Sequence, residues 1–145
     1  MAELDLIVTI GGRRVALPAA DVEAVVELDG LTPAPRAAPH VAGLSALRSR
    51  VLTVIDCLAA LGLGATNAAT LHDAVVVPSS GHPYALLVES VEDVLEAELA
   101  PGATRAPIGA GWEQAALGAI EADGDLLLLV DPHRIIAGPP AAQAA

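Results

Sequence analysis

Apolar and polar residues alternate in short runs along most of the chain, and this period of two is typical of β-strands that bury one face. Residues 4–10 and 14–17 alternate in this way around a Gly-Gly-Arg turn, so they predict a β-hairpin. The same pattern predicts further strands at residues 22–28, 41–48, 51–55, 74–77, 84–88, 91–99, 115–121 and 125–130. The sequence therefore predicts an all-β fold.

Proline and glycine mark the connections between these strands. Residues 32–40 contain three prolines and predict an extended segment, because proline cannot donate a backbone hydrogen bond. Residues 78–83 and 100–114 are rich in both residue types and predict loops.

Two short helices are predicted where strands end in aspartate. Asp56 is placed to cap a helix at residues 57–61, and Asp131 is placed to cap one that begins at Pro132 and ends at Gly138. Capping also explains both carboxylates without any catalytic role.

The sequence contains an internal repeat. Residues 15–27 return as residues 84–96 at an offset of 69, with six of the 13 positions identical. Residues 51–56 match residues 126–131 at an offset of 75, and Gly43 matches Gly118 in the same frame. Repeated units of this kind favour a pseudo-symmetric architecture with a surface or groove between the units.

Each repeat unit holds about five short strands and ends in a helical turn, which predicts a small closed barrel. We therefore expect a first barrel at residues 1–66, a second at residues 67–138 and a C-terminal tail at residues 139–145. The short helices are expected to plug or bridge the two barrels.

Composition and charge exclude several functions. The chain is 54% hydrophobic but has no Phe, so its core must be aliphatic. Its net charge is −11 and it lacks Lys, which argues against nucleic acid or an anionic membrane as a partner. The charge is uneven: residues 1–71 hold 7 acids and 5 arginines, whereas residues 72–145 hold 11 acids and 2 arginines. The acidic half can serve solubility or partner steering.

The sequence shows no secretory signal and no apolar run near the roughly 20 residues that a membrane span requires. We therefore expect a cytoplasmic protein with no direct membrane insertion.

No arrangement of residues predicts catalysis, a cofactor or a metal site. The histidines, His40, His72, His82 and His133, lack metal-ligand spacing and are expected on the surface. The position of Cys57 at a predicted helix N-terminus favours a lowered pKa, but its apolar neighbours favour a buried structural role. The pattern is that of a binding module.

One stretch resembles a known family. It runs Pro33-Ala-Pro35, then Val41-Ala-Gly43, then Leu47-Arg48, then an apolar strand that ends Val54-Ile55-Asp56. This order of motifs resembles the CheW family of bacterial chemotaxis adaptors, and the resemblance covers residues 4–137. Ser49 stands where that family usually has Gly, so the loop carrying Arg48 is expected to be strained or reshaped if its φ is positive.

The resemblance implies two SH3-like five-stranded β-barrel subdomains around a hydrophobic groove, without catalysis. It implies that the chain couples the cytoplasmic tip of methyl-accepting chemoreceptors to the regulatory domain of a CheA-type histidine kinase. Carried over by position, the receptor-binding residues are Val22, Gly43, Arg48, Val75, Ala85 and Val91.

Some of these assignments have structural alternatives. Val22 and Val91 are repeat equivalents that either line the groove or belong to the core. Arg48 either contacts the receptor or pairs internally with a carboxylate such as Glu23.

The expected kinase-binding surface combines an aliphatic patch with acids at its rim: Ala74, Val76, Tyr84, Leu86, Glu89 and Glu92. An alternative function is a CheW-like module of a non-motility chemosensory array, or one that titrates the kinase rather than coupling it. An enzyme of unrecognised type is a further alternative.

Overall fold

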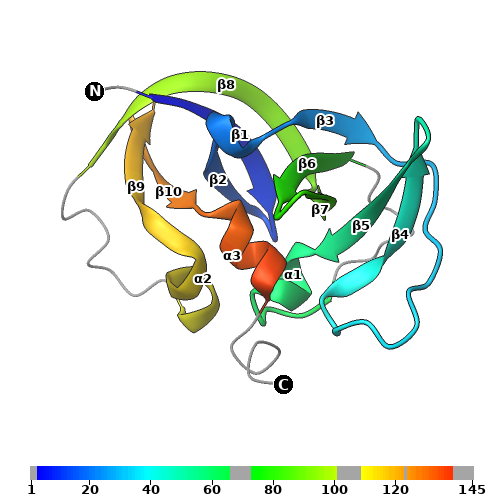
Figure 1. The fold of residues 1–145 in the computed structure, drawn as a ribbon. Helices are drawn as coiled ribbons and strands as arrows, with labels where there is room; N and C mark the ends of the chain where they lie inside the picture. The colour runs from blue at the N-terminus through cyan, green and yellow to red at the C-terminus, as the bar shows by residue number, and fades with distance from the viewer. Residues whose placement is uncertain (1–2, 66–72, 101–108, 123, 139–145) are drawn as a thin grey trace.

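Two five-stranded sheets face each other across a central layer of short helices in the computed structural model (Figure 1). The structure describes residues 3–65, 73–100, 109–122 and 124–138. The first sheet is a closed barrel in the order β1 (Glu3–Ile10), β2 (Arg13–Pro18), β10 (Asp125–Val130), β9 (Ala116–Ala122), β8 (Ser90–Leu99). The second runs β3 (Ala24–Glu27), β6 (Asp73–Ser79), β7 (His82–Leu87), β5 (Arg50–Asp56), β4 (Val41–Leu47).

The second sheet is nearly closed as well. Thr32, in the segment that follows β3, exchanges two backbone hydrogen bonds with Leu44 of β4, at 2.7 and 2.8 Å. This bridge brings the two edges of the sheet together. The predicted all-β fold with two five-stranded subdomains is confirmed.

The predicted division of the strands at residue 66 is wrong, because each sheet takes strands from both units. The hairpin β1–β2 joins β8, β9 and β10, whereas the hairpin β6–β7 joins β3, β4 and β5. The hairpin that begins each unit has therefore changed places: β1–β2 of unit 1–66 completes the sheet of unit 67–138, and β6–β7 of unit 67–138 completes the sheet of unit 1–66. Sequence periodicity identifies strands, but it does not say which unit a hairpin pairs with.

The internal repeat itself is visible in the strand register. Thr53 of β5 pairs with Tyr84 of β7, and the repeat-equivalent residues Leu128 and Val15 pair between β10 and β2. Both pairings are parallel, in sheets that are otherwise antiparallel. The two sheets are therefore copies of one strand arrangement.

Alternate side chains of the central strands enter two different apolar clusters, because both faces of these strands are covered. On β1, Leu6 and Val8 face the other sheet, whereas Ile7 faces the barrel interior. On β6, Val75 faces the other sheet and Val76 faces the interior of its own sheet.

The cluster between the sheets is the largest, and we call it the shared layer. Its buried members are Leu6, Val8, Ile10, Val15, Leu17, Ile55, Cys57, Ala60, Leu61, Val75, Val77, Leu86, Val88, Trp112, Ala115, Leu128, Val130 and Ile135.

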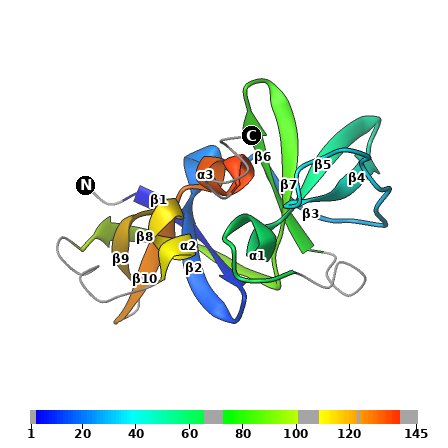
Figure 2. The same cartoon turned by 90° about the horizontal axis from the view of Figure 1, so that it is seen from below.

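Three short helices, α1 (Cys57–Ala60), α2 (Ala110–Ala115) and α3 (Pro132–Ala137), contribute residues to the shared layer. Figure 2 shows α1 and α3 between the barrel and the second sheet. The Asp56 carboxylate accepts hydrogen bonds from the backbone of Leu58 and Ala59, and Asp131 accepts one from His133. The predicted caps and the bridging role of these helices are confirmed.

Two predicted loops are partly regular structure. Residues 110–114, expected within a loop, and Ala115, expected to begin a strand, form α2. Trp112 and Ala115 are buried in the shared layer, and this tertiary packing outweighs the local glycines. Residues 78–83 belong mostly to the hairpin, whose turn is only Ser80-Gly81.

We predict that Gly111→Ala destabilises the protein by about 1 to 3 kcal/mol. A Cβ at Gly111 would lie 1.8 Å from the carbonyl oxygen of Leu61, so α2 would be forced away from α1. Gly30→Ala is the matched control, because a Cβ there meets nothing within 4 Å. Urea denaturation of both variants tests the packing, and equal stabilities would contradict it.

Candidate partner-binding surface

Val22 and Val91 occupy equivalent places at the edge of the shared layer. Val22 follows the short 3-10 helix η1 (Ala19–Asp21), and Val91 lies near the start of β8. Both side chains are half-buried and pack against the shared layer. Each therefore combines a packing role with an exposed portion that a partner can reach.

Three other residues of the predicted receptor set are inaccessible. Val75 and Ala85 have no exposed surface, since Val75 belongs to the shared layer and Ala85 to the interior of the second sheet. Gly43 is also buried, and a Cβ there would lie 2.6 Å from the carbonyl oxygen of Thr32. Their side chains support the surface and cannot contact a partner in this conformation.

Arg48 is exposed in the tight turn between β4 and β5. Arg48 and Ser49 are the two turn residues, with φ of +48° and +71°. A two-residue hairpin turn with two positive φ values favours glycine at its second position. Ser49 therefore strains this turn, as expected from its place in the motif.

The internal partner proposed for Arg48 belongs to another arginine. Nη1 of Arg50 lies 2.6 Å from Oε2 of Glu23, so this pair links β5 to the residue that follows Val22. Among the described residues, Arg48 has no ion pair or side-chain hydrogen bond. Its guanidinium is therefore available to a partner.

The predicted kinase-binding patch is mostly core. Ala74, Val76 and Leu86 are at most 2% exposed, because both faces of the β6–β7 hairpin are covered. Tyr84 is half-buried, and its ring makes an edge contact with His82 at a centroid distance of 5.1 Å. The aliphatic residues of this hairpin therefore cannot supply the contact area assigned to them.

The two predicted rim acids are exposed but already hold internal bonds. Oε1 of Glu89 accepts a hydrogen bond from the backbone of Gly12 at 2.9 Å. Oε2 of Glu92 lies 2.7 Å from Nε of Arg14. These bonds tie β8 to the β1–β2 hairpin, and they leave the acids at the surface.

The sequence analysis missed exposed apolar residues at repeat-equivalent positions. Val25 and Val94 are 48% and 45% exposed, and they are equivalent at the offset of 69. Val51 and Leu126 are 57% and 59% exposed, and they are equivalent at the offset of 75. The repeat, compared position by position, was the signal that could have identified them.

One histidine prediction is wrong, because His40 is buried. Its Nε2 lies 2.9 Å from the carbonyl oxygen of Ile136, and its ring fills the space beside Gly138 at the end of α3. His82 and His133 are exposed as expected, and His72 lies outside the described residues.

The remaining polar groups have structural roles. Burial raises the pKa of the Cys57 thiol, with a further contribution from the Asp56 carboxylate, so the thiol is inert. Asp21, Asp131 and His133 bring one potential ligand atom each within 4.8 Å of one another. Asp131 caps α3 and lies 3.6 Å from Arg134, and Asp21 lies 3.5 Å from His133, so ion pairing and capping account for this cluster.

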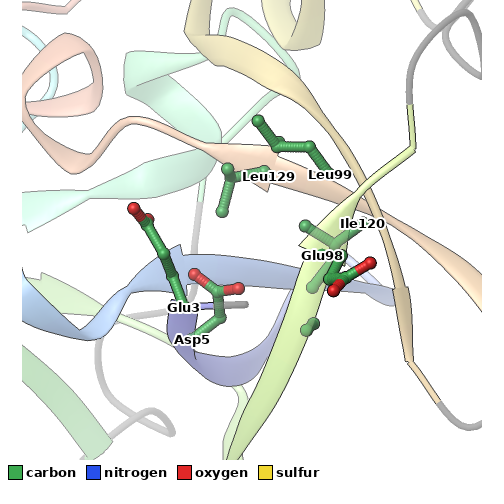
Figure 3. A pocket seen from close by; sticks show the side chains of 7 residues that line it. Glu3, Asp5, Glu98, Leu99, Ile120 and Leu129 are labelled. Atoms are coloured by element: carbon green, nitrogen blue, oxygen red, sulfur yellow. The ribbon is translucent and has the colours of Figure 1, made fainter. Parts of the chain in front are cut away.

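A cavity of about 230 Å³ opens into the closed barrel, away from the predicted groove. Figure 3 shows Glu3 and Asp5 extending from β1 toward Leu129 of β10. Asp5 is only 2% exposed. Desolvation by burial, followed by the nearby charge of Glu3, raises the pKa of the Asp5 carboxyl.

Comparisons with known proteins agree with this fold. The model of the CheW-like domain family matches residues 6–139. The chain is 31% identical over 115 residues to the chemotaxis protein CheW of Rhizobium meliloti (strain 1021). The alignment covers 77% of this chain and 74% of that protein. The crystal structure of the scaffolding protein TtCheW from Thermoanaerobacter tengcongensis has a similar fold, with a TM-score of 0.71 at 20% identity, covering 90% of this chain and 89% of that one.

These matches define a CheW-like domain made of two five-stranded β subdomains. The chain belongs to the CheW family. Among the described residues, no helix has the length and apolar character needed to span a membrane.

We predict that Ser49→Gly stabilises the protein by about 1 kcal/mol, because glycine adopts the left-handed conformation of this turn without a Cβ clash. Ser79→Gly is the control: Ser79 lies in strand β6, where glycine lowers stability. Chemical denaturation measures both free energies of unfolding. A loss of stability in Ser49→Gly would show that the turn is not strained.

Proposed function

We propose that this protein is a non-catalytic cytoplasmic adaptor that couples the tips of methyl-accepting chemoreceptors to the regulatory domain of a CheA-type histidine kinase. Membership of the CheW family is the observation that carries this proposal. The described structure supplies the physical support: a rigid apolar layer with two partner-accessible valines at its edge, and one exposed arginine without an internal partner.

The proposed receptor surface consists of Val22, Val91 and Arg48. A receptor tip is a helical hairpin, and an amphipathic helix binds by laying its apolar face on apolar side chains. Half-buried valines at the edge of the shared layer offer such contacts, and they are held in place by the residues behind them. The Arg48 guanidinium adds a charged contact that is not consumed within the chain.

The proposed kinase surface retains Tyr84, Glu89 and Glu92, since these side chains are at least partly exposed. The apolar contact area must come from exposed residues of the same sheet as Tyr84, such as Val25 and Val51. The acids act at the rim, where charges alter the association rate more than the affinity.

We predict that Arg48→Glu weakens binding to a receptor-tip fragment at least about tenfold, which corresponds to about 1.4 kcal/mol. The free energy of unfolding should change by less than about 0.5 kcal/mol, because Arg48 is exposed. Arg36→Glu is the matched control, since Arg36 is also exposed and also has a positive φ. Isothermal titration calorimetry measures the affinities.

Val22→Glu and Val91→Glu extend the same test to the apolar contacts. The proposed surface requires both variants to remain folded and to lose affinity. If they unfold, or if Arg48→Glu and Arg36→Glu bind equally well, the receptor surface lies elsewhere.

For the kinase contact, we predict that the on-rate for the regulatory domain falls as salt rises, while the off-rate stays nearly constant. The salt series should shorten the Debye length from about 30 Å at 0.01 M to about 8 Å at 0.15 M. Glu92→Gln should flatten the salt dependence more than Glu23→Gln. Glu23 is a fair control because it is the repeat equivalent of Glu92 and also pairs with an arginine. A salt-independent on-rate in surface plasmon resonance would show that the acids do not steer the partner and serve only to keep the protein soluble.

A further inference from the structure

The cavity in the closed barrel contains a buried carboxylate that the scaffold function does not use. Asp5 is 2% exposed, and among the described residues its side chain has no hydrogen-bond or ion-pair partner. A buried acid without a partner destabilises a protein, because the charged form loses its hydration without compensation. A ligand in the cavity can supply that compensation, because the carboxylate oxygens of Asp5, unlike Nδ1 of His40, are not sealed off from the space in front of them.

The strand pattern directs Asp5 and Glu3 into this cavity. Residues at every second position of β1 face the same side, and Ile7 on that side belongs to the barrel interior. Asp5 and Glu3 consequently face inward as well, which agrees with their common place in Figure 3.

The rest of the cavity wall is mostly apolar. It is formed by Ala97, Leu99, Ile120 and Leu129, together with a third acid, Glu98 of β8. Leu99 is 63% exposed, so the opening carries an apolar side chain at its rim.

The chemistry of this wall favours a large organic cation over a metal ion. No third Asp, Glu, His or Cys of the described residues joins Glu3 and Asp5 within 4.8 Å, whereas calcium takes six to eight oxygen ligands. A cavity of about 230 Å³ is also several times the roughly 30 Å³ that one water occupies. A side chain with an aliphatic stem and a cationic head would use both the apolar wall and the acids.

We propose that this cavity receives an arginine side chain from a protein partner. Arginine suits a partly buried carboxylate pair, because its guanidinium is weakly hydrated and presents five donors in a planar fork. Leu99, which is exposed at the rim of the cavity, offers apolar contact to a protein surface. The net charge of −11 attracts a basic partner.

The proposal does not depend on the receptor or kinase contacts, and it can be tested with a small probe. The probe is N-acetyl-arginine-methylamide, titrated into isotopically labelled protein and followed by the backbone amide signals of Asp5, Ala97, Ile120 and Leu129. We expect saturable shifts confined to the cavity, with at least tenfold weaker binding of the uncharged citrulline analogue.

Two pairs of variants separate the cavity acids from general charge. Asp5→Asn should weaken probe binding at least tenfold, whereas Asp29→Asn, at an exposed site in the other sheet's connections, should leave it unchanged. Glu3→Gln should weaken it as well. Its control is Glu27→Gln, because Glu27 is exposed on strand β3 of the other sheet, away from the cavity. These Glu variants also decide the matter if Asp5→Asn fails to fold.

Three results would overturn the proposal. Equal shifts with citrulline would show that the charge is not recognised. Tighter binding of Mg²⁺ than of the arginine probe at the same amides would identify a metal site. Binding that develops only in Arg105→Gln would show that the occupant is the chain's own arginine, which follows Leu99 by six residues in the sequence.

Discussion

The shared apolar layer between the two sheets is the interaction on which the rest of this structure depends. It is aliphatic apart from Trp112 and Cys57, and it draws residues from both hairpins and all three helices. Fully burying one Val, Leu or Ile contributes about 1.5 to 3 kcal/mol, so separating the sheets would expose far more than a domain's net stability. The layer therefore fixes the orientation of one sheet against the other.

Exchange of the N-terminal hairpins reinforces this arrangement and redistributes charge. Arg13 and Arg14 belong to the less acidic half of the sequence, but β2 places them in the barrel with the acidic strand β8. Arg14 pairs there with Glu92, and Arg13 lies over the ring of Trp112 at 5.3 Å. A scaffold built in this way can present separate partner surfaces at a fixed geometry, since neither sheet is formed by one half of the chain alone.

Much of the fold followed from sequence patterns whose physical basis is local. Alternation identified the strands, Asp56 and Asp131 identified the helix caps, and the repeat agreed with the strand register down to the pairing of Thr53 with Tyr84. Hairpin exchange could not be predicted, because both pairings satisfy the same alternation. Helix α2 was missed because its sequence is rich in glycine, which predicts a loop, whereas the helix is stabilised by the tertiary packing of Trp112.

The candidate surface was harder to predict for a related reason. Ala74 and Val76 face the interior of the second sheet, whereas Leu86, which pairs with Val75, faces the shared layer. The predicted patch therefore combined residues from two opposite faces of the hairpin, and both faces are covered. Arg48 and Arg50 are two residues apart in the sequence, and only the geometry of the turn decides that Arg50 is the one that forms the ion pair with Glu23. Asp5 interrupts an apolar strand, and its burial depends on β8 closing the barrel over it.

The central claim is that the shared layer makes both sheets one cooperative unit. Native-state hydrogen exchange across a denaturant series measures it most directly, because it reports the free energy of opening for each strand. The account predicts that the most protected amides of β2 and β7 open with the same free energy, equal to that of global unfolding. Opening of one sheet at a distinctly lower free energy, while the other remains protected, would contradict it.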